Sequence, residues 1–257
     1  MQLTVSANVT GVNMTLAALE KQIAFATKQA LNKSAVQAQS EIRVEMTRVF
    51  DRPTRWTLDA TRIEPATRTR LFANVFLKNR RGSPADKDTN ELYTQVFGGP
   101  RGRKPYETRL LRAGVLRSNE YTVPANGLDL DPYGNVPSGL IRTILSQLNA
   151  AGGPGYNSNV GQSKRSRRRV SRVGEVFVSR GTGAGAFLPR GIYVRKGVIT
   201  GPRGGSLYQY RMLLKIVTGR PRYGARLRMF DIVRRVVARD FDREFQAQLA
   251  TAISTAR

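Results

Sequence analysis

Residues 164–172 hold the densest group of charged side chains in the sequence. These nine residues contain six positive charges and no acid. Arginine and lysine in such a run bind phosphates or carboxylates, and no aromatic residue lies between them to stack on bases. The run therefore indicates a solvated loop, an arm that contacts phosphates, or a segment ordered only against an acidic partner. Its basic residues are Lys164, Arg165, Arg167, Arg168, Arg169 and Arg172.

Carboxylates are the other side chains that could support chemistry, because the sequence contains no histidine and no cysteine. It therefore lacks the commonest general base and metal ligand, and it has no thiolate. Asp129 and Asp131 come closest to a catalytic pair, but they lie among glycine, proline and asparagine residues, where aspartate is typical of turns. The other acids considered as ligands for magnesium form no recognisable set: Glu175, Asp231, Asp240 and Asp242. We predict no catalytic residue, no metal site and no cofactor.

The net charge points to a negatively charged partner. The chain has 43 Lys and Arg against 18 Asp and Glu, a formal charge of +25 in 257 residues. Such a charge causes strong self-repulsion unless phosphates or acidic proteins compensate it. Arginine outnumbers lysine, and the guanidinium group suits phosphate and carboxylate equally well. Nucleic acid and an acidic protein assembly both satisfy this pattern.

Helices are predicted at both ends of the chain. Residues 15–50 lack glycine and proline, are rich in helix-forming residues and repeat apolar residues every three or four positions. A short helix through residue 62, containing Trp56, is expected to follow Pro53. After residue 221 a second long helix is expected, with arginines opposite its apolar stripe. The stripe is Phe230, Val233, Val237, Phe241, Phe245 and Leu249, and the arginines are Arg234, Arg235, Arg239 and Arg243.

Strands and short helices are predicted between these ends. Alternating apolar residues indicate a strand at 69–78, followed by a polar loop at 79–90. Short helices are expected at 91–97, 105–113 and 137–148, with a turn at 131–135. Residues 120–123 are expected to be extended, and three strands at 175–179, 191–196 and 207–217 are expected to form an antiparallel meander.

These elements predict an α+β fold with a small, mostly antiparallel sheet flanked by the long N-terminal and C-terminal helices. We expect residues 1–257 to form a single domain with an insertion at about 80–170. A flexible basic arm at 151–174 is expected to follow from its glycine and arginine content.

The order of these elements resembles the minor tail and tail completion proteins of tailed double-stranded DNA phages, of the lambda type. Three segments carry the resemblance: residues 26–35 (ATKQALNKSA) in the N-terminal helix, residues 128–135 (LDLDPYGN) with the helix through 148, and the ending 226–257. The last two are similar to segments of prophage virion proteins. The match to lambda-type proteins lies mainly in the architecture.

The resemblance implies a structural protein of the phage neck. Several copies would form a ring that completes the tail and joins it to the filled head, between head-closure or portal proteins and the tail tube. Double-stranded DNA would pass through the ring. In this interpretation the arginines and lysine of 164–172, together with Arg234, Arg235 and Arg239, face the channel or acidic neighbouring rings.

Two other hypotheses remain open at this point. One is a free protein that binds nucleic acid without sequence preference through phosphate contacts. The other is an enzyme that acts on nucleic acid through carboxylate-bound magnesium. The N-terminus has no secretory pattern and no run of about 20 apolar residues is present. We therefore expect a protein made in a cytoplasm, without a membrane partner. The resemblance implies the virion as its final location, with the host cytoplasm as its location during assembly.

Overall fold

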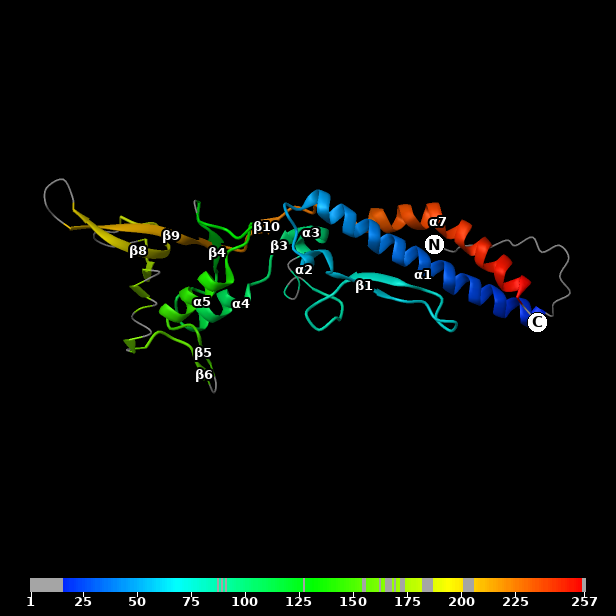
Figure 1. The fold of residues 1–257 in the computed structure, drawn as a ribbon, viewed down its shortest axis with the longest axis horizontal. Coiled ribbons are helices and arrows are strands. Elements are labelled where there is room, and N and C mark those ends of the chain that lie inside the picture. Colours follow the sequence, from blue (N-terminus) through cyan, green and yellow to red (C-terminus); the bar gives the residue numbers. More distant parts are fainter. Residues whose placement is uncertain are drawn as a thin grey trace. The chain divides into compact units, whose positions relative to one another are not determined.

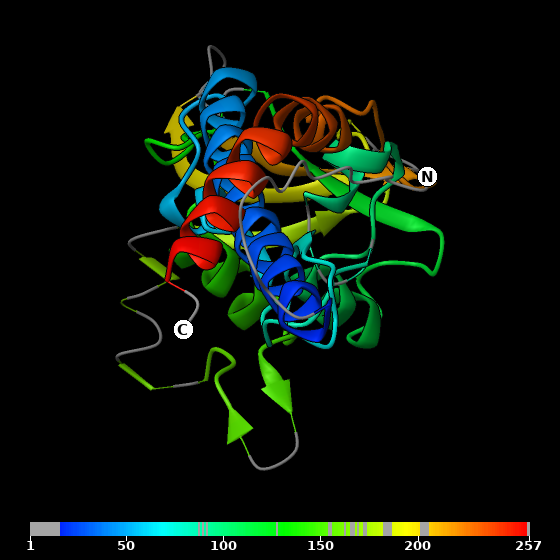
Figure 2. The same cartoon turned by 90° about the vertical axis from the view of Figure 1, so that its right-hand side faces the viewer.

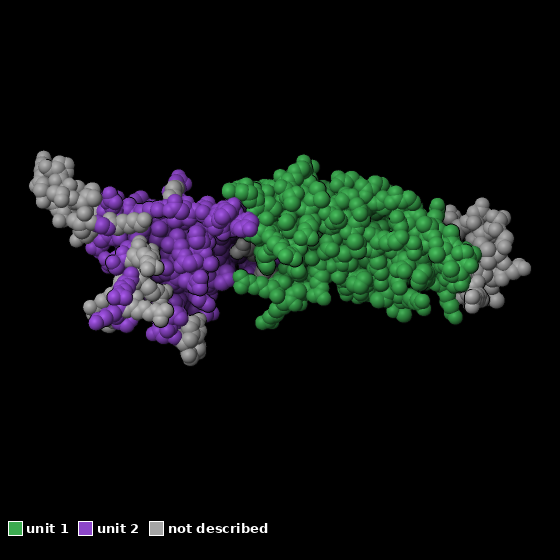
Figure 3. Space-filling model, viewed as in Figure 1, with its two compact units in different colours: residues 1–86, 225–257 green, residues 87–224 purple. Residues whose placement is uncertain are grey.

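The computed structural model divides the chain into two compact units (Figure 3). One unit contains residues 1–86 and 225–257, and the other contains residues 87–224. The predicted insertion at about 80–170 is therefore shorter than the observed intervening unit, which also includes the later strands. The structure describes residues 16–86, 88, 90, 92–126, 128–153, 156–161, 163, 164, 168, 170, 171, 174–181, 187–200 and 206–255.

The first unit is built on two long helices, α1 (Leu16–Val49) and α7 (Met229–Ser254). The helices lie side by side in both views of the ribbon (Figures 1 and 2). Small alanines of α1 allow the large side chains of α7 to approach closely. The buried cluster between them contains Ala26, Ala30, Phe241, Phe245 and Leu249.

The apolar stripe predicted for the first half of α7 was wrong by one residue. Met229, Ile232 and Val236 are buried, whereas Phe230 is 50% exposed. The buried row continues to Asp240, which is 6% exposed. Because the charged Asp240 belongs to the buried row, that row is not wholly apolar. The sequence pattern therefore favoured the neighbouring row that begins at Phe230.

A two-stranded antiparallel sheet packs on α1. It consists of β1 (Thr61–Glu64) and β2 (Asn74–Leu77). The Asn32 side chain fixes the following loop to α1, since it accepts from the Ala66 amide at 2.7 Å and donates to the Ala66 carbonyl at 3.2 Å. Two predicted boundaries were wrong here: the short helix is limited to α2 (Arg55–Leu58), and the strand begins only at Asn74.

The second unit contains a four-stranded antiparallel sheet with the order β4-β9-β8-β7. The predicted meander is confirmed, because β7, β8 and β9 are sequential neighbours, and the α+β class is confirmed as well. The strands are β4 (Glu120–Pro124), β7 (Glu175–Ser179), β8 (Gly191–Thr200) and β9 (Ser206–Thr218).

Two short helices, α4 (Pro105–Arg112) and α5 (Ser138–Gln147), pack with this sheet. Leu110 of α4 and Ile144 of α5 are fully buried against Ile192 and Leu214 of the sheet. The helices that cover the larger sheet are thus the two short ones. Both were predicted from the sequence, and α4 ends as expected before Gly114, which has a φ of 71°.

The remaining elements of this unit are short. They are α3 (Tyr93–Phe97), the strand pair β3 (Gly99–Pro100) and β10 (Arg222–Tyr223), and the strand pair β5 (Gly152–Gly153) and β6 (Tyr156–Asn157). The β5–β6 pair lies within the predicted arm at 151–174.

The α5 helix is anchored to the edge of the sheet by one side chain. The Gln147 amide accepts from the Val176 backbone amide at 2.8 Å and donates to the Gly174 carbonyl at 3.0 Å. These backbone groups belong to β7 and to the residue just before it. The contact fixes the position at which β7 begins.

Candidate nucleic-acid interface

The excess positive charge is distributed unevenly between the two units. Residues 87–224 contain 23 Lys and Arg against seven Asp and Glu, whereas the rest of the chain contains 20 against 11. The larger excess therefore lies in the unit that contains the four-stranded sheet. A surface for a polyanion is expected where cations have no acidic neighbours.

The arginines predicted on α7 lie on its exposed side, but ion pairs within the first unit engage them. Arg239 Nη2 is 2.7 Å from Oε1 of Glu41 on α1, and Arg235 Nη2 is 3.4 Å from Oε2 of the same carboxylate. Arg239 also donates two hydrogen bonds to Asp240, at 3.0 and 2.6 Å. The hydrogen bonds from Arg239 hold the pKa of Asp240 and of Glu41 below their ordinary values.

Arg234 is the most exposed of the three α7 residues, with 80% of its side chain accessible. Its guanidinium lies 3.6 Å from Asp231, one turn earlier on the same helix. The α7 surface therefore carries both signs of charge. The sequence placed these arginines on one side of the helix correctly, but it did not reveal the acids of α1 that face them.

The basic run at 164–172 is described only in part. Lys164 and Arg168 are exposed. Arg165, Arg167, Arg169 and Arg172 lie outside the described residues, so their predicted contact with phosphates or an acidic partner stays a prediction.

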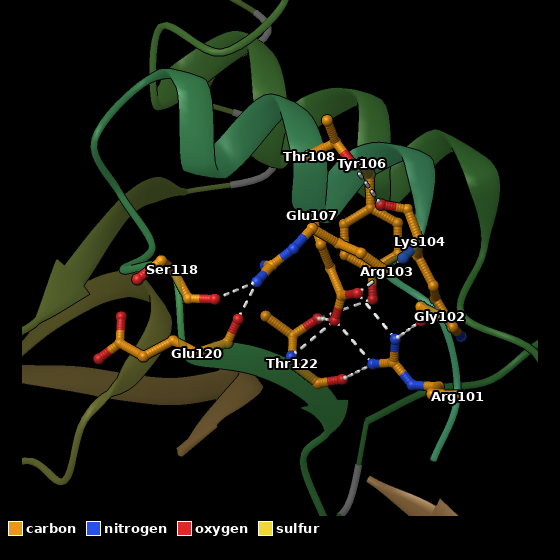
Figure 4. Close-up of polar contacts among 10 residues, drawn as sticks. All are labelled: Arg101, Gly102, Arg103, Lys104, Tyr106, Glu107, Thr108, Ser118, Glu120 and Thr122. Carbon is orange, nitrogen blue, oxygen red and sulfur yellow. Dashed lines mark hydrogen bonds and ion pairs between the residues drawn. The ribbon is translucent and has the colours of Figure 1, made fainter. Parts of the chain in front are cut away.

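A buried ion pair explains the structure of the basic turn at 101–104 (Figure 4). Arg101 donates to both carboxylate oxygens of Glu107, at 2.7 and 2.8 Å. The same carboxylate accepts from the backbone amide and the hydroxyl of Thr122 on β4, and from the backbone amide of Lys104. Because Glu107 lies in the first turn of α4, this network ties the start of the helix to the sheet.

Glu107 stays ionised in this position. Burial raises the pKa of its carboxyl group, but the hydrogen bonds from Arg101, Thr122 and Lys104 outweigh that effect. The net pKa lies below the ordinary value of 4.5. A fully hydrogen-bonded, paired carboxylate of this kind holds elements together and has no lone pair directed at solvent.

A second buried acid, Glu120, organises the loop after α4. Arg190 binds both of its carboxylate oxygens, at 2.9 and 2.8 Å, and the Arg117 backbone amide donates to it at 2.8 Å. These hydrogen bonds lower the pKa of Glu120. Arg103 lies 4.4 Å from the centre of the Tyr121 ring and donates to the carbonyls of Ser118 and Glu120. Three of the unit's arginines, 101, 103 and 190, are thus used internally.

The exposed side of α4 and α5 carries positive charge only. The one acid in the two helices is Glu107, which is buried. The exposed residues of the helices are Pro105, Arg109, Arg112, Ser138, Gly139 and Arg142. We call this surface the α4–α5 face. Sequence reasoning missed its arginines, although a signal was present: residues 108–119 and 132–174 contain no acid.

Five of the six acids considered as magnesium ligands make other contacts in the described part of the chain. Asp131 accepts from the backbone amides of Tyr133 and Asn135, as expected for a turn, and Asp129 pairs with Arg211 at 2.9 Å. Among the described residues, no three acidic side chains are grouped closely enough to hold a metal ion.

Comparison with models of known protein families found no match, and the searches of curated proteins and of solved structures also found none. Within the described residues, no helix combines the length and the apolar character that crossing a bilayer requires.

Proposed function

We propose that the chain is a structural component of the neck of a tailed phage. Several copies would form a ring that completes the tail and joins it to the DNA-filled head, next to head-closure or portal proteins and the tail tube. The proposal has its origin in the resemblance of residues 26–35, 128–148 and 226–257 to tail completion and prophage virion proteins. The α+β fold with long terminal helices agrees with the expected architecture.

The observation that best supports a position around DNA is the internal use of acids in residues 87–224. Glu107 and Glu120 are buried with Arg101 and Arg190, so they do not offset the cations on the surface. A protein beside passing DNA needs contacts with phosphates that are independent of sequence. Exposed arginines without acidic neighbours provide such contacts, and they require no catalytic group.

Electron cryomicroscopy of intact virions tests this proposal. We expect density for the chain as a ring at the head–tail junction, and particles assembled without the chain should contain filled heads that lack joined tails. Immunogold labelling of purified particles provides an independent localisation. Absence of the chain from purified virions would reject the neck proposal.

A second candidate function is a free protein that binds nucleic acid through phosphates, and the α4–α5 face favours it. In that case the purified chain would bind DNA as a monomer and would be missing from virions. Mass photometry with and without DNA separates this function from ring formation. A salt-sensitive affinity alone agrees with both candidates.

A further inference from the structure

The α4–α5 face differs in charge from the exposed surfaces of the two long helices, α1 and α7. Its three charged side chains, Arg109, Arg112 and Arg142, are all positive. None of the three has an ion-pair partner among the described residues. In contrast, α1 and α7 present Glu41, Glu45, Asp231 and Glu244 beside their cations.

The three arginines extend from helices that are fixed at their ends. Glu107 holds the first turn of α4 to β4, and Gln147 holds the last turn of α5 to the edge of β7. Arg109 and Arg112 are three residues apart, so they lie on the same side of α4. Figure 1 shows α4 and α5 next to each other on the sheet. The guanidinium groups are therefore presented by a rigid base.

Apart from these arginines, the exposed residues of the two helices are Pro105, Ser138 and Gly139, none of which has an aromatic ring. Such a surface offers no ring for stacking on an unpaired base. Arginine forms strong two-bond contacts with phosphate, and contacts of this kind carry no sequence information. The face thus fits a duplex backbone better than single-stranded nucleic acid.

We infer that the α4–α5 face binds the phosphate backbone of double-stranded DNA through Arg109, Arg112 and Arg142. The inference rests on the proposed function for the choice of duplex DNA as the polyanion. It moves the main contact away from Arg234, Arg235 and Arg239, whose charges are shared with Glu41, Asp231 and Asp240. The contact is independent of base sequence.

The test compares the 257-residue parent chain with four variants, three of which remove three positive charges each. The first variant carries Arg109→Gln, Arg112→Gln and Arg142→Gln, and the second carries Arg234→Gln, Arg235→Gln and Arg239→Gln. A control variant carries Arg43→Gln, Arg48→Gln and Arg55→Gln, which are exposed in the first unit and form ion pairs there. Circular dichroism first verifies that each variant is folded.

Binding of a 30-base-pair duplex of random sequence is then measured by fluorescence anisotropy from low to moderate salt. For the α4–α5 variant we expect the slope of log affinity against log salt to fall by about 2.7, or about 0.9 for each lost phosphate contact. The control should keep the slope of the parent chain. A variant with lysine at positions 109, 112 and 142 should restore it, because the charges return.

Several results would overturn the inference. One is no DNA binding by the parent chain at 50 mM salt, and another is an unchanged salt slope in the α4–α5 variant. The others are an equal decrease in slope for the control variant or a larger decrease for the α7 variant. An unchanged slope in the α4–α5 variant would favour an acidic protein as the partner of this face. Virion imaging separates the two proposals. If the chain is found at the neck but its α4–α5 variant binds DNA normally, the neck proposal stands and the role of this face is rejected. If the chain is absent from virions but its α4–α5 variant loses DNA binding, the neck proposal is rejected and the role of the face stands.

Discussion

The guanidinium of Arg101 lies against the carboxylate of Glu107, with Nη2 2.7 Å from Oε1 and Nη1 2.8 Å from Oε2. Arg101 is 7% exposed and Glu107 is fully buried. Because Glu107 also accepts from Thr122 and Lys104, its carboxylate connects the basic turn, the start of α4 and strand β4. The pair removes one acid and one base from the surface together.

Replacing Glu107 with glutamine should destabilise the protein strongly. The change leaves the Arg101 charge buried without its partner, which costs about 3–5 kcal/mol. Chemical denaturation followed by circular dichroism measures the free energy of unfolding. The matched control is Glu175→Gln, which breaks the exposed pair with Arg195 and should cost about 0–1 kcal/mol. Equal losses in the two variants would contradict the structural role of Glu107.

Stability should fall in acid. Glu107 and Glu120 have pKa values below 4.5 in the folded protein, so the unfolded chain takes up protons first as the pH decreases. Their contribution is complete above about pH 4.5 and is lost as the pH falls through the lower folded-state values. Denaturation curves at pH 7, 5, 4 and 3 provide the measurement.

The variant Glu120→Gln gives the control for this pH dependence. It should be less stable at pH 7 and should lose less stability between pH 5 and pH 3 than the parent chain, because one linked carboxyl group is gone. The same acid dependence in both proteins would show that Glu120 does not contribute.

Gly174 should not tolerate alanine. Its φ is 95°, and a Cβ atom would lie 2.7 Å from Cγ2 of Val194 and against the Arg195 carbonyl oxygen. Strain and steric overlap together should cost about 2 kcal/mol or more, measured as the loss in free energy of unfolding. Gly224→Ala is the matched control because a Cβ atom there meets nothing within 4 Å. A loss at Gly174 no larger than at Gly224 would be inconsistent with the packing of β8.

Arg239 should matter for the pairing of α1 and α7. It joins Glu41 of α1 to Asp240 of α7, whereas Arg234 pairs with Asp231 of its own helix. Differential scanning calorimetry at low salt should therefore show a larger drop in melting temperature for Arg239→Gln than for Arg234→Gln. The difference should shrink at high salt, because both residues are partly exposed. A larger drop for Arg234→Gln would favour a different role for this surface.

Local sequence signals predicted most of the elements because their causes are local. Pro105 and Gly114 bound α4, and the alternation of Glu175–Ser179 marks β7. Strand β1 escaped prediction because its partner β2 begins ten residues after β1 ends and its own residues follow a helical segment. The buried row of α7 was misplaced because Asp240 belongs to it.

The candidate site was less predictable than the fold. The carboxylate of Glu107 is bound by Thr122, which is 15 residues away on β4, as well as by Arg101 and Lys104 nearby in the sequence. Arg235 and Arg239 both pair with Glu41, almost 200 residues earlier. Counting charges along the sequence does not reveal such long-range ion pairs. The arginines on one side of α7 form a clear sequence pattern but have acidic neighbours in the fold, whereas Arg109, Arg112 and Arg142 have no ion-pair partner among the described residues.

The Gln147 contact at the edge of the sheet has one more consequence. An open edge strand offers a row of backbone donors and acceptors to which a strand of another molecule can add. The amide of Gln147 occupies the Val176 donor and the Gly174 acceptor in the manner of a fifth strand. At high protein concentration, this side chain hinders the edge-to-edge addition of strands from a second molecule, which is a common route to aggregation.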